Sequence, residues 1–368
     1  MKKKLTKISP KLKKPKRLSN LSLKPLRRRP KPEEKISEAL KSVPRITNDT
    51  VEEHRAEMLS SARKYIYPLT SSKHHVVRNS ILLLILVVIV FFASCGLALY
   101  KFQSTGGFIY GVTEVVPFPA AKAGSHYVSY ESYLFELRRN MHYYHTQQHA
   151  DFSTAGGKQQ LKHLKQQAMD AVVQNTYVNE LAKQNGVTVS DSAVNDEVNL
   201  LRSQNRLGNS DRVLREVLNE FWGWSESDFK RELHQQMLQQ AVVAKLDTAT
   251  NQRAQAALNQ LEQGANFSKL AAKVSDDAPT RANGGQYVAP ITADDRSLPP
   301  ALAAQITKLK PGQTSGIINT GYALEIVKII SNDKGTLRAA HIQFRFKPIS
   351  DYTTQLKKQQ PVYEYIKI

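Results

Sequence analysis

One uncharged apolar segment limits what this chain can fold into more than any other feature of its sequence. Residues 80–100 read SILLLILVVIVFFASCGLALY, which is 21 positions without a charged side chain. A helix of that length spans the hydrocarbon core of a bilayer, and a helix buried in a soluble core rarely needs so long an apolar run. The sequence therefore predicts one transmembrane helix over residues 79–100.

The charge on either side of this segment predicts its orientation. Residues 1–78 carry 22 Lys and Arg against 7 Asp and Glu, while the whole chain of 368 residues has a net charge of +20. Because basic residues accumulate on the cytoplasmic side of membrane helices, we expect a cytoplasmic N-terminus and extracytoplasmic C-terminal domains. The long basic region also argues against a cleaved signal peptide, whose basic segment is short.

The basic tail, residues 1–78, is predicted to be largely disordered. Its first 32 residues are rich in Lys, Arg, Pro and Ser, and the prolines interrupt any helix. We expect the tail to associate with anionic lipids at the inner leaflet. Nucleic acid is the alternative partner, but we do not favour it, because residues 1–60 contain no aromatic side chain to stack on bases.

The only cysteine, Cys95, is interpreted as a small apolar residue of the membrane helix rather than as a lipid attachment site.

Residues 107–246 show the three- and four-residue periodicity of packed helices. Helical patterns cover residues 130–144, 158–185, 192–204, 212–221 and 226–246, and residues 108–118 read as a short apolar strand. The segment NGVTVSDSAVNDEV at 185–198 joins two of these helices. It resembles the helical N-terminal module of SurA- and PrsA-type chaperones, and the resemblance implies a module that contacts unfolded polypeptides.

Residues 251–330 carry a second pattern, with one part absent. Its pieces are LEQGANFSKLA at 261–271, SDD at 275–277, NGG at 283–285, LKPG at 309–312 and GYALEIVK at 321–328. They resemble the parvulins, the PpiC-type peptidyl-prolyl cis-trans isomerases or rotamases, in which three helices lie among antiparallel strands. The family's first strand, which carries a histidine, is absent between residue 246 and the helix predicted from residue 251.

The resemblance also implies which residues form an isomerase site. The family's acidic or thiol position falls on Asp277, which we take as catalytic, and its two apolar proline-pocket positions fall on Leu298 and Leu302. Tyr322 is a third candidate for substrate binding. The histidine that follows Gly-Tyr in the family is Ala323 here, which puts efficient catalysis in question.

A candidate for the absent strand stands near the C-terminus. Residues 338–346 read RAAHIQFRF, in which apolar residues alternate with polar ones as in a half-buried strand, and they look like the family's opening strand. We therefore hypothesise a permuted parvulin-like domain over residues 247–346, with His341 as the second catalytic candidate. The alternative is that the last 31 residues begin a second, truncated repeat or form an unrelated tail. Residues 347–368 are predicted to contain a helix and a closing strand.

These features together predict an α+β protein with a disordered tail, one membrane helix, a helical chaperone-like module and a parvulin-like antiparallel sheet with helices. Prolyl isomerisation requires no covalent chemistry, so we expect no metal or other cofactor; the protein lowers a barrier of about 18–20 kcal/mol by favouring the twisted amide. The predicted function is a membrane-anchored foldase for newly exported, proline-containing proteins. A holdase chaperone with a degenerate isomerase domain is the alternative, and clients and oligomeric state stay open.

Overall fold

The structure is a computed structural model of the chain and describes residues 36, 40–41, 46–66, 69–208, 210–292 and 295–368. The disorder predicted for the basic tail falls largely on residues outside these ranges. The chain divides into two compact units, residues 1–87 and 88–368, and each is described by itself.

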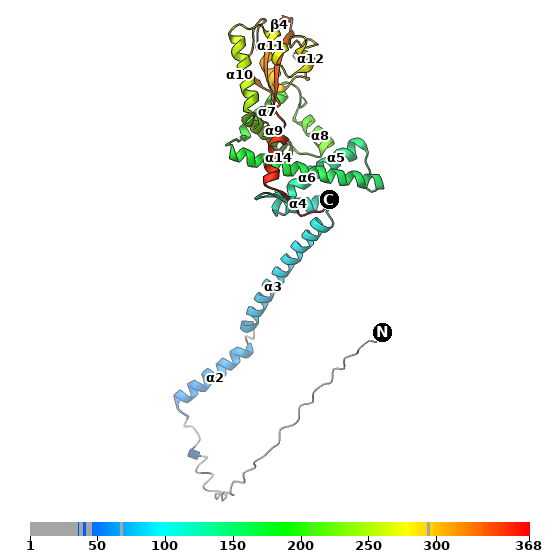
Figure 1. Cartoon of the computed structure of the whole chain (residues 1–368). Helices are drawn as coiled ribbons and strands as arrows, with labels where there is room; N and C mark the ends of the chain where they lie inside the picture. Colours follow the sequence, from blue (N-terminus) through cyan, green and yellow to red (C-terminus); the bar gives the residue numbers. More distant parts are fainter. Residues whose placement is uncertain (1–35, 37–39, 42–45, 67–68, 209, 293–294) are drawn as a thin grey trace. The chain divides into compact units, whose positions relative to one another are not determined.

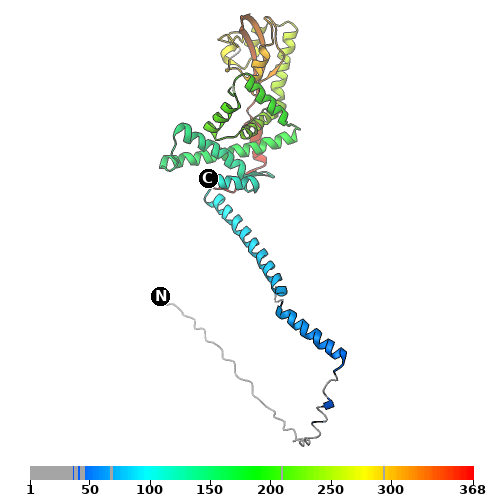
Figure 2. The same ribbon diagram turned by 180° about the vertical axis from the view of Figure 1, so that it is seen from behind.

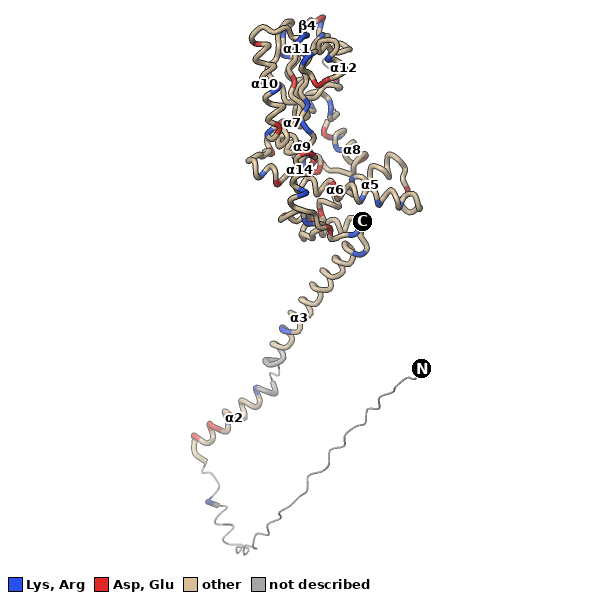
Figure 3. Tube along the Cα trace, viewed as in Figure 1, with Lys and Arg blue, Asp and Glu red and all other residues tan. Residues whose placement is uncertain are grey.

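Two helices dominate the N-terminal part of the described chain. They are α2 (Asn48–Ile66) and α3 (Leu69–Gly96), and α3 continues into the π-helical turn η1 (Leu97–Lys101). The segment His74–Lys101 is long and apolar enough to cross a membrane, with a mean hydropathy of 3.1 in its most apolar window. Figure 3 shows the long uncharged stretch of α3, and only 6% of that window is buried within the protein, as expected for a helix that faces lipid.

Residues 107–246 form what we call the helical module. Its elements along the chain are α4 (Gly107–Val115), β1 (Pro119–Ala123), β2 (His126–Ser129), α5 (Tyr130–Gln148), α6 (Ala155–Gln184), α7 (Asp191–Ser203), α8 (Asp211–Trp222) and α9 (Glu226–Leu246). The long helix α6 packs against both α5 and α9. Helices α5 to α9 each begin after a Ser or Thr whose side chain accepts a hydrogen bond from the backbone N–H three residues later. These caps explain why the helices start where they do.

The strand predicted over residues 108–118 is wrong, because most of this segment is helix α4. A short run that is apolar on all sides has no periodicity that separates a strand from a helix. Here the helical spacing places Ile109 and Thr113 together on the side that faces the core, and α4 packs against α5. The first strand, β1, begins only at Pro119.

The C-terminal segment returns to the helical module. Helix α14 (Ile349–Gln359) packs against α6, and strand β6 (Val362–Glu364) pairs antiparallel with β1 to give the strand order β2-β1-β6. The side chains of Leu356 and Ile366 are buried in the same core as β1 and α6. The helix and strand predicted for residues 347–368 are thus present, and they complete the helical module.

Residues 247–346 form what we call the sheet module. Its elements are α10 (Thr248–Glu262), α11 (Phe267–Val274), α12 (Ala278–Arg281), α13 (Pro300–Ile306), β3 (Ile318–Asn319), β4 (Ala323–Asp333) and β5 (Thr336–Arg345). The strands form an antiparallel sheet in the order β3-β4-β5. Its two faces bury two separate apolar clusters, one with α10 and α11 and the other with α13. Figures 1 and 2 show this module from opposite sides.

The pairing of β4 with β5 is the one that a permuted parvulin-like domain requires. The two strands pair over ten positions, with Val327 opposite His341 and Glu325 opposite Gln343. The described chain has no strand between α9 and α10, because Asp247 follows α9 directly and its side chain caps α10. The late strand β5 therefore lies beside β4, where the hypothesis places the absent first strand.

Candidate active site

Strands β4 and β5 bring one carboxylate and one imidazole to the same face of the sheet. Side chains alternate across a strand, so the apolar residues Leu324 and Ile326 face α10 and α11, and Glu325 between them faces the other way. His341 occupies the equivalent position on β5, between Ala340 and Ile342. The sheet thus places both polar groups on the side away from α10 and α11.

A loop segment adds a second carboxylate from outside the sheet. The backbone N–H of Asp276 donates to the carbonyl of Gln343 at 2.7 Å, and the N–H of Gln343 donates to Ser275 Oγ at 3.1 Å. These bonds fix the Ser-Asp-Asp segment along the edge of β5. Asp277, the last residue of the segment, then begins the short helix α12 beside His341.

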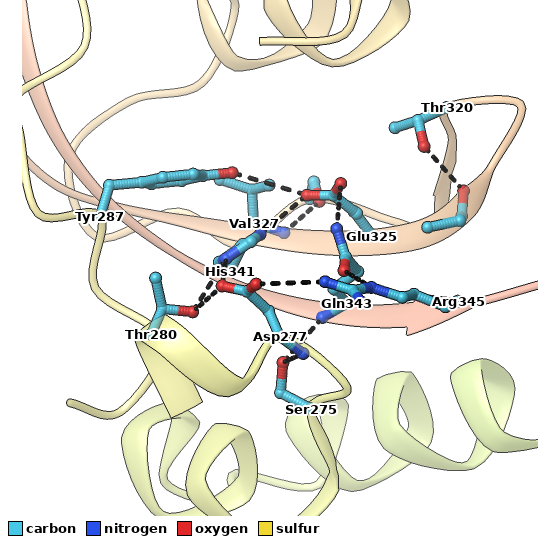
Figure 4. A network of polar contacts seen from close by, with 12 residues as sticks. Ser275, Asp277, Thr280, Tyr287, Thr320, Glu325, Val327, His341, Gln343 and Arg345 are labelled. Carbon is cyan, nitrogen blue, oxygen red and sulfur yellow. Dashed lines mark hydrogen bonds and ion pairs between the residues drawn. The ribbon is translucent and has the colours of Figure 1, made fainter. Parts of the chain in front are cut away.

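His341 lies between the two carboxylates, as Figure 4 shows. Its Nδ1 is 2.9 Å from Glu325 Oε2, and its Nε2 is 3.1 Å from Asp277 Oδ2. The hydroxyl of Thr280 donates to Asp277 Oδ2 at 2.5 Å and also lies 3.0 Å from His341 Nε2. The ring of Tyr287 stacks on the imidazole with a centroid distance of 4.4 Å, which fixes the imidazole plane.

The two carboxylates favour the charged form of the imidazole. Burial lowers the pKa of His341, but hydrogen bonds and charge from Glu325 and Asp277 outweigh this effect, and the pKa is raised. Burial likewise acts to raise the pKa of Asp277, yet hydrogen bonds from Thr280 and His341 outweigh it, and the pKa is lowered. Both shifts favour the charged pair, an imidazolium of His341 hydrogen-bonded to an ionised Asp277.

Of the three charged groups, Asp277 is the one open to solvent. Its side chain is 15% exposed, compared with 6% for His341 and 3% for Glu325. Arg345 Nη2 lies 3.7 Å from the other oxygen of the Asp277 carboxylate. This geometry leaves the Asp277 carboxylate partly open to solvent and keeps the imidazole of His341 buried beneath it. Among the described residues no group of three or more His, Cys, Asp or Glu side chains has a geometry that could hold a metal ion.

The two predicted proline-pocket residues lie in the apolar cluster on the same face of the sheet. Leu298 and Leu302 pack there with residues of α13, β3 and β4, and Tyr287 lines the cluster from the side of His341. Leu302 is only 1% exposed, so a proline ring would reach it only after neighbouring groups move. The role of both leucines in substrate binding stays a prediction.

Tyr322 is separate from this cluster. Its side chain is 64% exposed, and its hydroxyl accepts a hydrogen bond from Gln236 Nε2 of α9 at 2.5 Å. The structure thus brings Asp277 and His341 together, places Leu298 and Leu302 in the adjacent apolar cluster, and ties Tyr322 to the helical module.

Sequence reasoning missed Thr280, Tyr287 and Glu325 as members of the site. Of these three residues, Glu325 was the one that the sequence could have indicated. It stands inside the apolar run ALEIVKII, and a carboxylate is seldom buried without a partner. Glu325 stands two residues after Ala323, which is the position of the family's second histidine. Strand periodicity puts both positions on the same face of β4, so this face carries the carboxylate of Glu325.

Comparison with protein families gives two matches. The model of the SurA-like N-terminal domain matches residues 69–243, and the model of the PPIC-type PPIase (rotamase) domain matches residues 236–331. The chain carries a SurA-like N-terminal domain and a PPIC-type domain. This combination supports a foldase or chaperone of the parvulin family. The PPIC-type match ends at residue 331, so strand β5 and His341 lie beyond it.

Comparison with solved structures includes the foldase protein PrsA from Streptococcus pneumoniae. The match covers 52% of this chain and 76% of that chain, at 18% sequence identity and a TM-score of 0.19. No curated protein matches the chain. The assignment of the PPIC-type domain therefore depends on the family model.

Proposed function

We propose that the PPIC-type domain catalyses cis-trans isomerisation of X-Pro peptide bonds, with Asp277 and His341 as its catalytic pair. The observation that carries this proposal is the hydrogen bond between His341 and Asp277, at 3.1 Å, in a site where Glu325 holds the other side of the imidazole. Residues from a loop, β4 and β5 converge there, next to an apolar cluster that includes Leu298 and Leu302. The proposed domain extends over residues 247–346, so that β5 completes it.

The carboxylate of Asp277 would act on the charge distribution of the amide. In the planar amide the nitrogen lone pair is delocalised and the carbonyl oxygen carries extra negative charge, which gives the C–N bond its double-bond character. A carboxylate close to that oxygen disfavours the planar form more than the twisted transition state, where delocalisation is lost. The His341 imidazolium would keep Asp277 oriented, and the apolar cluster would receive the proline ring after local movement.

We further propose that α3 anchors the protein in a membrane with its N-terminus in the cytoplasm and both folded modules outside. The support is the apolar segment His74–Lys101 and the excess of Lys and Arg on its N-terminal side. The basic tail would lie near anionic headgroups of the inner leaflet. The clients would then be unfolded or newly exported polypeptides that contain proline.

A proline-limited refolding reaction tests the proposed activity. The full chain in detergent is expected to accelerate refolding, and Asp277→Ala and His341→Ala should each lower kcat/KM on the order of 100-fold. Asp333→Asn, which changes an exposed carboxylate at the far end of β4, serves as the matched control and should leave the rate unchanged. Full activity in Asp277→Ala would contradict the proposal.

A non-catalytic holdase is the second candidate function, and two observations favour it. Ala323 replaces the family's second histidine, and Leu302 is buried rather than open to a ligand. In that case the PPIC-type domain would be a peptide-binding scaffold. The same preparation distinguishes the two candidates, because a holdase suppresses aggregation of an unfolded client without accelerating its proline-limited refolding.

A further inference from the structure

One face of helix α4 is an apolar stripe, and the two large side chains near its ends are exposed, whereas Gly111 and Val112 between them are half-buried. Phe108 is 73% exposed and Val115 is 83% exposed. With 3.6 residues per turn, positions 108, 111, 112 and 115 fall on one face of the helix, and all four are uncharged: Phe, Gly, Val and Val. Large apolar side chains grouped on one exposed face indicate an interaction surface.

The opposite face of α4 is fixed to the helical module. Ile109 and Tyr110 pack against its core, and Thr113 is buried. The Tyr110 hydroxyl donates to Glu131 of α5 at 3.2 Å, and the guanidinium of Arg138 lies over the Tyr110 ring at 5.0 Å. The module therefore determines which way the apolar stripe faces.

The end of the membrane helix lies next to the beginning of α4. The backbone N–H of Ser104 donates to the carbonyl of Ala98 at 2.9 Å, so the chain turns back onto the last turn of the apolar helix. Helix α4 begins only three residues later, at Gly107, within about 11 Å of that turn even for a fully extended chain. The exposed Phe102 lies between the two elements.

Hydrogen bonds hold the end of the membrane helix against the helical module. The Tyr130 hydroxyl donates to the carbonyl of Leu99 at 2.7 Å, and the Tyr100 hydroxyl donates to the carbonyl of Pro119 at 2.8 Å. Lys165 Nζ donates to Gln103 Oε1 at 2.6 Å. These bonds tie residues 99–103 to β1, α5 and α6 instead of leaving them as a free linker. Figures 1 and 2 both show α4 beside the end of this helix.

We propose that α4 is an interfacial helix, whose stripe of Phe108, Gly111, Val112 and Val115 inserts into the headgroup region of the outer leaflet. We assign a lipid surface as the partner of this stripe, because the stripe lies next to the end of the membrane helix and the bilayer is the apolar environment at that point. Amphipathic helices bury an apolar face at this depth. The inference rests on the membrane anchoring proposed above.

Spin-label accessibility in the full chain tests this inference. In a Cys95→Ala background, reconstituted into phosphatidylcholine–phosphatidylglycerol vesicles, a nitroxide is placed at Phe108→Cys, Gly111→Cys or Val115→Cys. Val288→Cys is the matched control, because Val288 is a valine that is 92% exposed in the sheet module. Leu86→Cys, within α3, reports separately on whether the anchor is inserted.

The three labels on α4 should be more accessible to oxygen than to a water-soluble nickel chelate, at a shallower depth than the label at Leu86. The label at Val288 should show the reverse preference. If the labels on α4 are accessible to the nickel chelate while the label at Leu86 is not, the interfacial helix is overturned and the membrane anchor stands. Shielding of the α4 labels from both reagents would indicate that a protein partner covers the stripe. This result would also overturn the interfacial helix. Aqueous accessibility at Leu86 would overturn the anchor itself and, with it, the interfacial helix.

Discussion

His341 Nε2 lies 3.1 Å from Asp277 Oδ2, although 64 residues separate the two in the sequence. Asp277 follows helix α11 within the region matched by the PPIC-type family model, whereas His341 comes from a strand beyond that region. The contact exists because β5 folds back along β4 and the Ser-Asp-Asp segment hydrogen-bonds to the edge of β5. The proposed active site thus depends on β5, the last strand of the sheet module.

Glu325→Gln should lower both the pKa of His341 and the isomerase activity. The substitution keeps the shape of the side chain but removes the charge 2.9 Å from His341 Nδ1, which helps to keep the imidazole protonated. We expect the imidazole pKa, followed by NMR, to fall and kcat/KM to decrease by about 10-fold. Gln343→Glu is the comparison variant. It adds a carboxylate two residues after His341, on the same face of β5, and should not lower the pKa of His341. An unchanged His341 titration in Glu325→Gln would contradict the assigned role of Glu325.

The free energy of unfolding should depend on pH through His341. Because the pKa of His341 is raised in the folded protein, the stabilisation is complete below the unfolded pKa of about 6.5 and is lost as pH rises through the folded pKa. Asp277, whose pKa is lowered, provides stabilisation that is lost only in acid, as pH falls through its folded pKa. In urea denaturation, wild type should therefore lose more stability than His341→Asn as pH rises from below about 6.5 through the folded pKa of His341. Parallel pH profiles for the two proteins would contradict this expectation.

Gly285→Ala should disrupt the site far more than Gly264→Ala. Both glycines have positive φ angles, +82° and +88°, which disfavour any side chain. At Gly285 an added Cβ would also collide with the backbone oxygen of His341, whereas at Gly264 nothing lies within 4 Å. We expect a loss of about 1 kcal/mol for Gly264→Ala and of more than about 3 kcal/mol for Gly285→Ala in denaturant unfolding. Equal losses would show that the loop at Gly285 adapts.

Ala323→His, which introduces the histidine of the family pattern, should not raise the isomerase activity. Ala323 is buried on β4, so a larger side chain there should destabilise the domain by about 1–3 kcal/mol. Ile330→His, at a position of the same strand that is 44% exposed, is the control and should cost less stability. A clear rise in kcat/KM for Ala323→His would mean that Glu325 does not replace the missing group.

Ile366→Ala should destabilise the helical module. Ile366 is 1% exposed in the core that includes β1 and α6, and removing its side chain should cost about 2–4 kcal/mol. Ile330→Ala, at a position that is 44% exposed on β4, should cost much less. Hydrogen exchange should locate the loss of protection in β1 and α6 rather than in β4. Loss confined to β4 would contradict the assignment of the C-terminal segment to the helical module.

The sequence by itself determined the elements whose physical cause is local. An uncharged run of 21 residues is long enough for a membrane span, Ser and Thr caps mark where helices begin, and alternating apolar residues identify β5 as a strand. It also named Asp277 and His341 as candidates, because each stands in a short motif that resembles the parvulin pattern. The sequence did not distinguish a helix from a strand in the segment that forms α4, because apolar residues there follow neither periodicity clearly.

Only the tertiary structure decided which distant groups meet. Thr280, Tyr287 and Glu325 join the site through the register of β4 with β5 and the path of the loop beside them, and no local pattern encodes that register. Helix α14 and strand β6 likewise join the helical module, because the apolar side chains of Leu356 and Ile366 are buried there. Side-chain periodicity fixes which face of an element is apolar, and packing in three dimensions decides what that face meets.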